Sequence, residues 1–193
     1  MSKRIALLSA AAFGALALTA TVVAPVSAQD KMTKSELSGE KTVMVGGAAM
    51  FPSKNIIQNA VNSKDHTTLV AAVKAAGLVD TLEGPGPFTV FAPTNEAFDK
   101  LPAGTVDTLV KPENQATLTK ILTYHVVAGK LEASDLTDGK KLKTVQGEEL
   151  TVKRSGDTVM IVDSKGDSST VTIPNVNQSN GVIHVVDTVL MPS

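Results

Sequence analysis

The stretch Phe88-Thr89-Val90-Phe91-Ala92-Pro93-Thr94-Asn95-Glu96-Ala97-Phe98 contains the change of structure around which the chain is organised. Its first four residues are β-branched or aromatic, which favours a buried strand. Pro93 cannot donate a hydrogen bond to a neighbouring strand, and the Thr94 hydroxyl can accept one from an unpaired amide at the start of a helix. Ala97 and Phe98 then give that helix an apolar face. The stretch therefore predicts a strand that turns a tight corner into a short, capped helix.

A strand-to-helix corner also occurs in nucleotide-binding proteins, where glycine amides between strand and helix hold a phosphate. No glycine lies between Phe91 and Thr94. The run Gly84-Pro85-Gly86-Pro87 comes before the strand instead, and its two prolines lack an amide hydrogen. The corner is therefore interpreted as structural rather than as a phosphate site.

Helical patterns lie on both sides of this unit. Residues 55–61 space their apolar side chains as one helix face requires, and Ser53 is the expected cap. A second helix is expected from Asp65 to Gly77, a residue type that commonly ends helices. Further helices are predicted over 104–110 and 112–122, the latter with a proline in its first turn.

The second half of the chain has the pattern of strands. Short apolar runs alternate with glycine-containing turn sequences, which indicates hairpins. The last run is almost continuously apolar, as in a strand covered on both faces. The predicted strands span residues 124–127, 142–145, 149–153, 158–162, 170–173 and 182–190. Because helices cluster in the first half and strands in the second, the sequence predicts an α+β fold rather than alternating βαβ units.

The N-terminal residues have the order of a secretory signal. Lys3 and Arg4 precede an apolar run from Ile5 to Ala24, and Val26-Ser27-Ala28 supplies the small residues that signal peptidase requires, which predicts cleavage after Ala28. The alternative is an uncleaved membrane anchor, because about 20 apolar residues can span a bilayer. With cleavage, no integral membrane span remains. The predicted organisation is a signal peptide at 1–28, a flexible N-terminal lead at 29–52 and a single domain at 53–193.

Composition argues against several classes of function. Removal of Lys3 and Arg4 reduces 18 basic residues to 16, against 19 acidic residues, so the remaining net charge is −3. Without a basic excess, nucleic acid is not an expected partner. The absence of cysteine excludes disulfides and thiolate metal sites. No Gly-x-Ser-x-Gly or His-Glu-x-x-His motif is present, so an enzyme of a standard hydrolytic class is not expected.

The three histidines, His66, His125 and His184, are the remaining candidates for metal ligands. His66 is expected at a helix start, whereas His125 and His184 lie in apolar strand patterns, where a neutral imidazole bonds to backbone or hydroxyl groups. Neither a metal site nor a cofactor is therefore predicted. Tyr124 and His125 follow each other in a predicted strand, so one side chain is expected to face inward and the other outward or toward a neighbouring element.

Three stretches resemble landmarks of the fasciclin (FAS1) domain family. Residues 88–98 are similar to its first signature, residues 180–190 to its second, and Tyr124-His125 to the tyrosine-histidine pair between them. The resemblance covers roughly Asn55 to Pro192 and extends to small, exported, single-domain bacterial members. It implies a compact wedge of β-strands with helices packed along one side and the two signature strands adjacent. The residues assigned to this structural signature are Phe88, Phe91, Pro93, Thr94, Asn95, Phe98, Asn180, Gly181, Ile183 and His184.

Adjacent signature strands lead to the expectation that Phe91 and Ile183 belong to one core. The function that the resemblance implies is adhesion by an exported, non-enzymatic module, secreted, periplasmic or at the cell surface, which binds a protein or matrix component. The candidate binding residues are Tyr124, His125 and Asn175. Animal members carry an acidic residue linked to integrin binding where this chain has Asn175. An integrin-type metal contact needs a charged oxygen ligand, so the amide argues against that mode.

The alternative function is that of a periplasmic small-molecule carrier or enzyme. This alternative requires a concave apolar pocket with a few convergent polar groups. The sequence defines neither the identity of the partner nor the oligomeric state.

Overall fold

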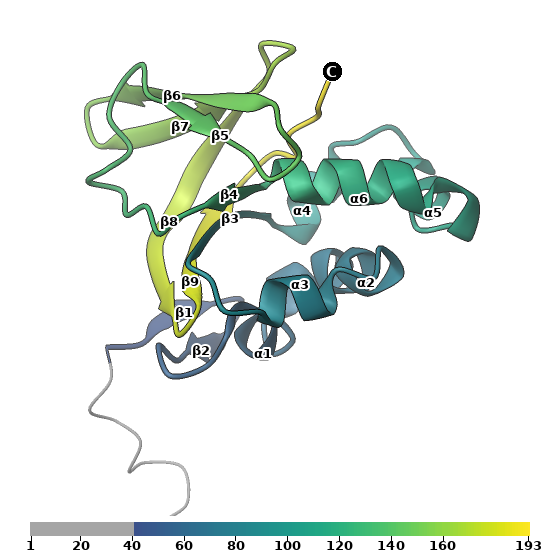
Figure 1. Ribbon diagram of the computed structural model, residues 1–193, viewed down its shortest axis with the longest axis horizontal. Helices are drawn as coiled ribbons and strands as arrows, with labels where there is room; N and C mark the ends of the chain where they lie inside the picture. The colour runs from purple at the N-terminus through teal and green to yellow at the C-terminus, as the bar shows by residue number, and fades with distance from the viewer. Residues whose placement is uncertain (1–40) are drawn as a thin grey trace, which may run out of the picture. The chain divides into compact units, whose positions relative to one another are not determined.

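A seven-stranded mixed sheet is the centre of the computed structural model, which describes residues 41–193 (Figure 1). The strand order is β4-β3-β9-β8-β7-β6-β5. Strands β3 and β9, which carry the two signatures, pair in parallel, and every other neighbouring pair is antiparallel. The strands are β3 (Phe88–Pro93), β4 (Val126–Ala128), β5 (Lys141–Lys143), β6 (Glu149–Ser155), β7 (Thr158–Val162), β8 (Ser168–Gln178) and β9 (Gly181–Val186). The predicted signal peptide at 1–28, with its cleavage after Ala28, lies outside the described residues.

The sheet curls until its two edge strands, β4 and β5, meet. Val127 and Thr144 form an isolated bridge, and the Val145 amide donates to the Val126 carbonyl at 2.8 Å. The face turned inward carries one apolar core. Its buried side chains are Phe91, Tyr124, Val127, Leu136, Leu142, Leu150, Val152, Val159, Ile161, Val186 and Leu190.

The helices cover the outer face of the sheet around β3, β4 and β9, where they bury a second core (Figure 1). They are α1 (Ile56–Ala60), the 3-10 helix η1 (Lys64–His66), α2 (Thr67–Ala75), α3 (Val79–Glu83), α4 (Asn95–Asp99), α5 (Thr105–Leu109), the 3-10 helix η2 (Pro112–Asn114) and α6 (Gln115–Tyr124). The prediction of an α+β fold with helices along one side and adjacent signature strands is confirmed.

Phe91 and Ile183 lie on opposite sides of the sheet, so the expectation that they share one core is wrong. In the parallel register, Val90 is opposite Ile183 and Phe91 is opposite His184. Successive side chains of a strand point to opposite faces. Val90 and Ile183 therefore face the helices, whereas Phe91 faces the interior of the curled sheet.

The corner between β3 and α4 agrees with the prediction. The Thr94 side chain accepts a hydrogen bond from the Ala97 amide at 3.3 Å and caps α4. Asn95 connects this corner to the start of α2, because its amide oxygen accepts from the Thr68 amide at 3.1 Å and its nitrogen donates to the Lys64 carbonyl at 2.8 Å. The first signature therefore joins the sheet to two helices.

Two local predictions near the beginning of the described residues are corrected. Part of the expected flexible lead forms a hairpin of β1 (Val43–Val45) and β2 (Ala48–Met50), with Val45 and Met50 buried in the helix-side core. Gly46 and Gly47 adopt φ values of 57° and 75°, the left-handed conformations that a tight hairpin turn requires. Helix α1 is capped by the Asn55 side chain rather than by Ser53.

The predicted strand at 124–127 begins only at Val126, because α6 continues through Tyr124 and ends with His125 as its C-cap. Residues Leu118, Ile121, Leu122 and His125 keep the helical spacing of i, i+3, i+4 and i+7, and all four are buried. The predicted last strand also ends earlier, at Val186 rather than at residue 190.

Candidate functional site

The Tyr124 side chain is completely buried, and its hydroxyl accepts a hydrogen bond from the Ser164 amide at 2.9 Å. Burial raises the pKa of the phenol, although the contacts with Ser164 oppose the change. The ring therefore belongs to the core, and its polar tip holds the turn between β7 and β8. A buried tyrosine with a satisfied hydroxyl is a common structural arrangement.

The His125 ring is also buried, and both of its nitrogens are hydrogen-bonded. Nδ1 donates to the Ile121 carbonyl at 2.9 Å, so Nε2 is unprotonated and accepts from the Leu190 amide at 3.0 Å. Burial lowers the pKa of the ring to about 4, against opposing effects of the Ile121 carbonyl and Asp163. Tyr124 and His125 lie at the end of a helix, so the expected alternation across a strand is wrong: both side chains are buried, and His125 contacts the neighbouring segment at Leu190.

The neutral His125 predicts a loss of stability in mildly acidic solution. The folded-state pKa of about 4 lies below the ordinary histidine pKa of 6.5, so the unfolded chain takes up a proton first as the pH falls. The loss of stability that this proton uptake causes is absent above pH 6.5. It grows as the pH falls toward 4, where it reaches about 3 kcal/mol. Urea unfolding at pH 7, 6, 5 and 4 is therefore expected to give a steadily smaller free energy of unfolding.

A His125→Gln variant provides the control, because an amide can donate to Ile121 and accept from Leu190 without titrating. Its free energy of unfolding should change less over the same range. His66 and His184 also have lowered pKa values caused mainly by burial. The variant's free energy of unfolding should therefore still decrease somewhat as the pH falls. An unchanged slope in His125→Gln would show that His125 is not its source.

Asn175 lies in an irregular part of β8. Its hydrogen bonds go to residues other than Tyr124 and His125. Its φ of 57° is a left-handed conformation that asparagine tolerates better than most residues. Its side-chain oxygen accepts from the Ala133 amide at 2.7 Å, and its backbone amide donates to His184 Nδ1 at 3.4 Å. His184 Nε2 in turn donates to the Leu131 carbonyl at 2.8 Å. Asn175 and His184 thus hold the segment after β4 against β8 and β9.

The second signature begins with two residues that connect distant parts of the chain. Asn180 accepts from the Ile56 amide at 3.1 Å and donates to the Leu82 carbonyl at 2.7 Å, so it joins α1 and α3 to the sheet. Gly181 lies beside Phe88 in the register of β3 and β9, and a Cβ atom at this position would stand 2.1 Å from the Phe88 carbonyl oxygen. The signature residues therefore serve the fold.

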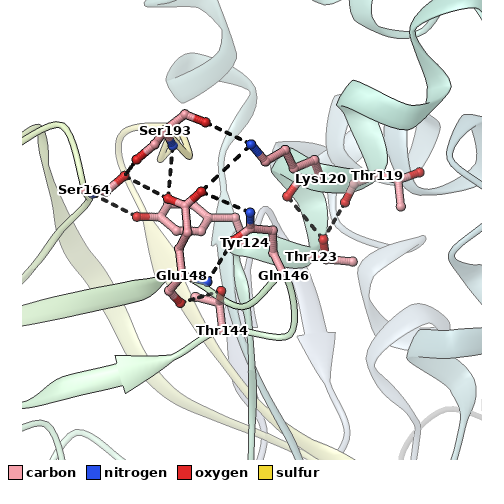
Figure 2. Close-up of polar contacts among 9 residues, drawn as sticks. All are labelled: Thr119, Lys120, Thr123, Tyr124, Thr144, Gln146, Glu148, Ser164 and Ser193. Atoms are coloured by element: carbon pink, nitrogen blue, oxygen red, sulfur yellow. Dashed lines mark hydrogen bonds and ion pairs between the residues drawn. The ribbon is translucent and has the colours of Figure 1, made fainter.

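A polar cluster beside Tyr124 was not predicted from the sequence (Figure 2). The Glu148 carboxylate accepts from the Ser193 amide and the Ser164 hydroxyl at 3.0 Å each, and from the Gln146 side chain at 3.1 Å. Lys120 Nζ lies 3.9 Å from the same carboxylate and donates to the Ser193 carbonyl at 2.8 Å. These five residues, Lys120, Gln146, Glu148, Ser164 and Ser193, are called the Glu148 patch.

The donors around Glu148 lower the pKa of its carboxyl to about 2, with the Ser193 amide as the largest cause. The carboxylate is therefore charged at any physiological pH, and its side chain retains 25% of its accessibility. The residues of the Glu148 patch come from α6, the turn after β5, the turn after β7 and Ser193. No short sequence motif therefore predicts it. The arrangement offers a fixed negative charge and hydroxyl groups for polar contacts.

The three histidines are each hydrogen-bonded within the fold. Within residues 41–193, no three or more His, Cys, Asp or Glu side chains come together in a way that could hold a metal ion. His125 and His184 are bonded to backbone groups, and His66 Nδ1 lies 2.9 Å from the Ser63 hydroxyl. His66 precedes α2, as expected of a helix start.

The sheet and the two signatures define a FAS1 domain, and a family model described as "Fasciclin domain" matches residues 64–192. The chain belongs to the fasciclin domain family. Protein sll1483 of Synechocystis sp. is 48% identical, over 79% of this chain and 82% of that protein. Immunogenic protein MPB70 of Mycobacterium bovis is 35% identical over 97% and 96%, and cell surface glycolipoprotein MPB83 of the same species is 40% identical over 77% and 64%.

A solved structure supports the fold. The chain matches a FAS1 domain pair from the insect cell adhesion molecule Fasciclin I with a TM-score of 0.65 and 19% identity. The match covers 73% of this chain and 52% of that one. In the part of the chain from residue 41 onward, no helix combines the length and apolar character that crossing a membrane requires.

Proposed function

We propose that this chain is an exported binding module of the periplasm, cell surface or extracellular space that contacts a protein or matrix component and catalyses no reaction. Its membership of the fasciclin family and its similarity to a protein named as a cell surface glycolipoprotein support this proposal. The predicted signal peptide at 1–28 is consistent with it. The contact surface is sought away from the candidate binding residues Tyr124, His125 and Asn175, because their side chains are engaged within the fold.

The observation that carries the proposal is the Glu148 patch. Protein interfaces combine an apolar centre with polar groups around it. The Val145 side chain is 47% exposed next to Gln146 in the turn that presents Glu148. Hydrogen bonds already hold Glu148, so a partner would meet an ordered carboxylate and less conformational entropy would be lost on binding.

Replacement of Glu148 by glutamine tests the proposal. The amide keeps an acceptor oxygen but removes the charge, so binding to a surface fraction of the producing cells should weaken about tenfold, the effect of a contact worth about 1.4 kcal/mol. Biolayer interferometry measures the affinity, and thermal unfolding measures stability in parallel. Because one carboxylate oxygen becomes an amide group that faces hydrogen-bond donors, a fall in melting temperature is also expected. The weaker binding is therefore measured well below both melting temperatures, where parent and variant are folded.

Glu83→Gln is the matched control, because Glu83 is an exposed carboxylate on α3. It should bind like the parent. Tyr124→Phe provides the comparison for a scaffold effect, since it removes only the hydroxyl that accepts from Ser164, and its losses of binding and stability should run in parallel. If Glu148→Gln binds like Glu83→Gln, the Glu148 patch is not the contact surface.

A further inference from the structure

An apolar cavity of about 60 Å³ lies between the outer face of the sheet and the helices α1, α2, α3 and α6. Its walls include Val73 and Leu82 from the helices and Val126 and Ile183 from the sheet. These side chains belong to the helix-side core and are almost fully buried. Most of the cavity therefore lies inside a core, where empty space forfeits packing contacts.

The cavity reaches the surface through two exposed residues of its lining. Thr81 on α3 and Val145 in the turn after β5 both line it and are exposed to solvent. Thr123 of α6 is half-buried at its edge. Figure 1 shows α3 and α6 on the same side of β3 and β4, with the turn after β5 close to the end of β4. A narrow ligand is therefore expected to enter on the side of Thr81 and Val145.

One buried polar atom of a residue that lines the cavity makes no well-aligned hydrogen bond. The His66 side chain lines the cavity and is only 3% exposed, and its Nε2 makes no hydrogen bond. Nδ1 is already paired with the Ser63 hydroxyl at 2.9 Å. Burial lowers the pKa of His66, and a contact with the Ala92 carbonyl opposes this effect without meeting the geometry of a hydrogen bond. An unsatisfied buried nitrogen costs free energy that a hydrogen-bonding ligand would recover.

We propose that this cavity binds the end of a free, unbranched aliphatic chain that carries a hydroxyl or a similarly small hydrogen-bonding group. A cavity of about 150 Å³ holds benzene, so the smaller volume favours a narrow chain of a few carbons over a ring. A hydroxyl both donates and accepts, so it can bond to His66 Nε2 in either tautomer. The ligand proposed for this cavity is a small molecule, whereas the contact proposed for the Glu148 patch is with a protein or matrix component.

Linear alcohols from butan-1-ol to octan-1-ol are suitable probes. In methyl NMR titrations of the purified protein, saturable shifts are expected for Val73, Leu82 and Ile183 and not for the exposed Met44. Each added methylene that enters the cavity should strengthen binding about fourfold, since burial of one is worth about 0.8 kcal/mol. The gain should stop once further carbons project beyond Thr81. Absence of saturation up to the solubility limit of every alcohol would overturn the proposal.

The imidazole nitrogens give a separate readout. Alcohol binding should shift the ¹⁵N resonance of His66 Nε2 and leave that of His125 Nε2 unchanged, because the latter is bonded to Leu190. An unchanged His66 resonance at methyl saturation would contradict the hydrogen bond and with it the assigned ligand class.

Two tryptophan variants on α3 provide the matched test. Thr81 and Glu83 are both exposed, but only Thr81 lines the cavity. Thr81→Trp should fill the opening and reduce the affinity for hexan-1-ol at least tenfold, whereas Glu83→Trp should stay within twofold of the parent. Equal effects of the two variants would overturn the proposal.

Phosphatidylcholine vesicles distinguish a free chain from one embedded in a membrane. The protein is expected to remain in the supernatant when such vesicles are sedimented. Co-sedimentation that Thr81→Trp abolishes would overturn the assignment to a free chain.

Discussion

Replacement of Gly181 by alanine is expected to destabilise the protein by about 3 kcal/mol or more, at the upper end of the range for overpacked sites. The added Cβ would lie 2.1 Å from the Phe88 carbonyl oxygen and 2.9 Å from its carbon. Both atoms belong to the backbone, so no side chain can rotate away. The beginnings of β3 and β9 would have to separate, and the parallel pair at the centre of the sheet would be disturbed. Urea unfolding monitored by circular dichroism measures the loss.

Gly156→Ala is the control for this prediction. Gly156 has a φ of 60° in the turn between β6 and β7, and a Cβ there would meet nothing within 4 Å. Its replacement carries only the left-handed conformational cost of about 1–2 kcal/mol. Gly181→Ala should therefore cost more although its backbone is not left-handed. A smaller loss for Gly181→Ala than for Gly156→Ala would contradict the close approach of the two strands.

Replacement of Phe91 by alanine is expected to cost about 3–5 kcal/mol and to lower the melting temperature by roughly 10 °C. The Phe91 ring is completely buried inside the curled sheet and stacks on His184 with ring centroids 5.7 Å apart. Its removal leaves a void between strands that form a nearly closed layer, which can contract little. Differential scanning calorimetry at pH 7 measures the change.

Phe51→Ala carries the same substitution to a half-buried site, where the ring lies under the Lys54 ammonium group at 4.9 Å. The cost there should be well below that of Phe91→Ala. Equal costs at the two positions would show that the interior of the curled sheet is not the more tightly packed environment.

Elements specified by neighbouring residues could be predicted from the sequence. The strand, corner and helix at 88–98 depend on the order of β-branched residues, Pro93 and Thr94, and the structure shows this unit with its cap. The hairpins of β6, β7 and β8 likewise follow from glycine-containing turns at the predicted positions. In each case, the determining contacts lie within a few residues.

Predictions failed where a pattern was compatible with two structures. Ile121 and Leu122 lie shortly before Tyr124-His125 and Val126 and Val127 directly after it, so a strand and the last turn of a helix fit equally well. Tertiary packing decides the matter, because His125 completes the buried stripe of α6 and bonds to Leu190. The opposite placement of Phe91 and Ile183 depends on the register of two distant strands, which composition does not define.

Of the residues described in the candidate site, the sequence predicted only those that belong to the family signature. Resemblance to the family identified Asn180, Gly181 and His184, and the structure explains each through a contact with a distant segment. The Glu148 patch and the apolar cavity each combine segments that lie far apart along the chain. No local spacing relates these segments, so their proximity emerges only when the sheet has closed.

The position of β9 has a consequence for the timing of folding during synthesis. This strand lies between β3 and β8 in the sheet, yet it is the latest of the strands along the chain. Until the ribosome has released residues 181–186, β3 and β8 have no shared neighbour, and the inner and outer cores both lack one wall. Contacts between residues so distant in sequence also slow folding. A nascent chain of this topology is therefore expected to complete both cores only after residue 186 has left the ribosome.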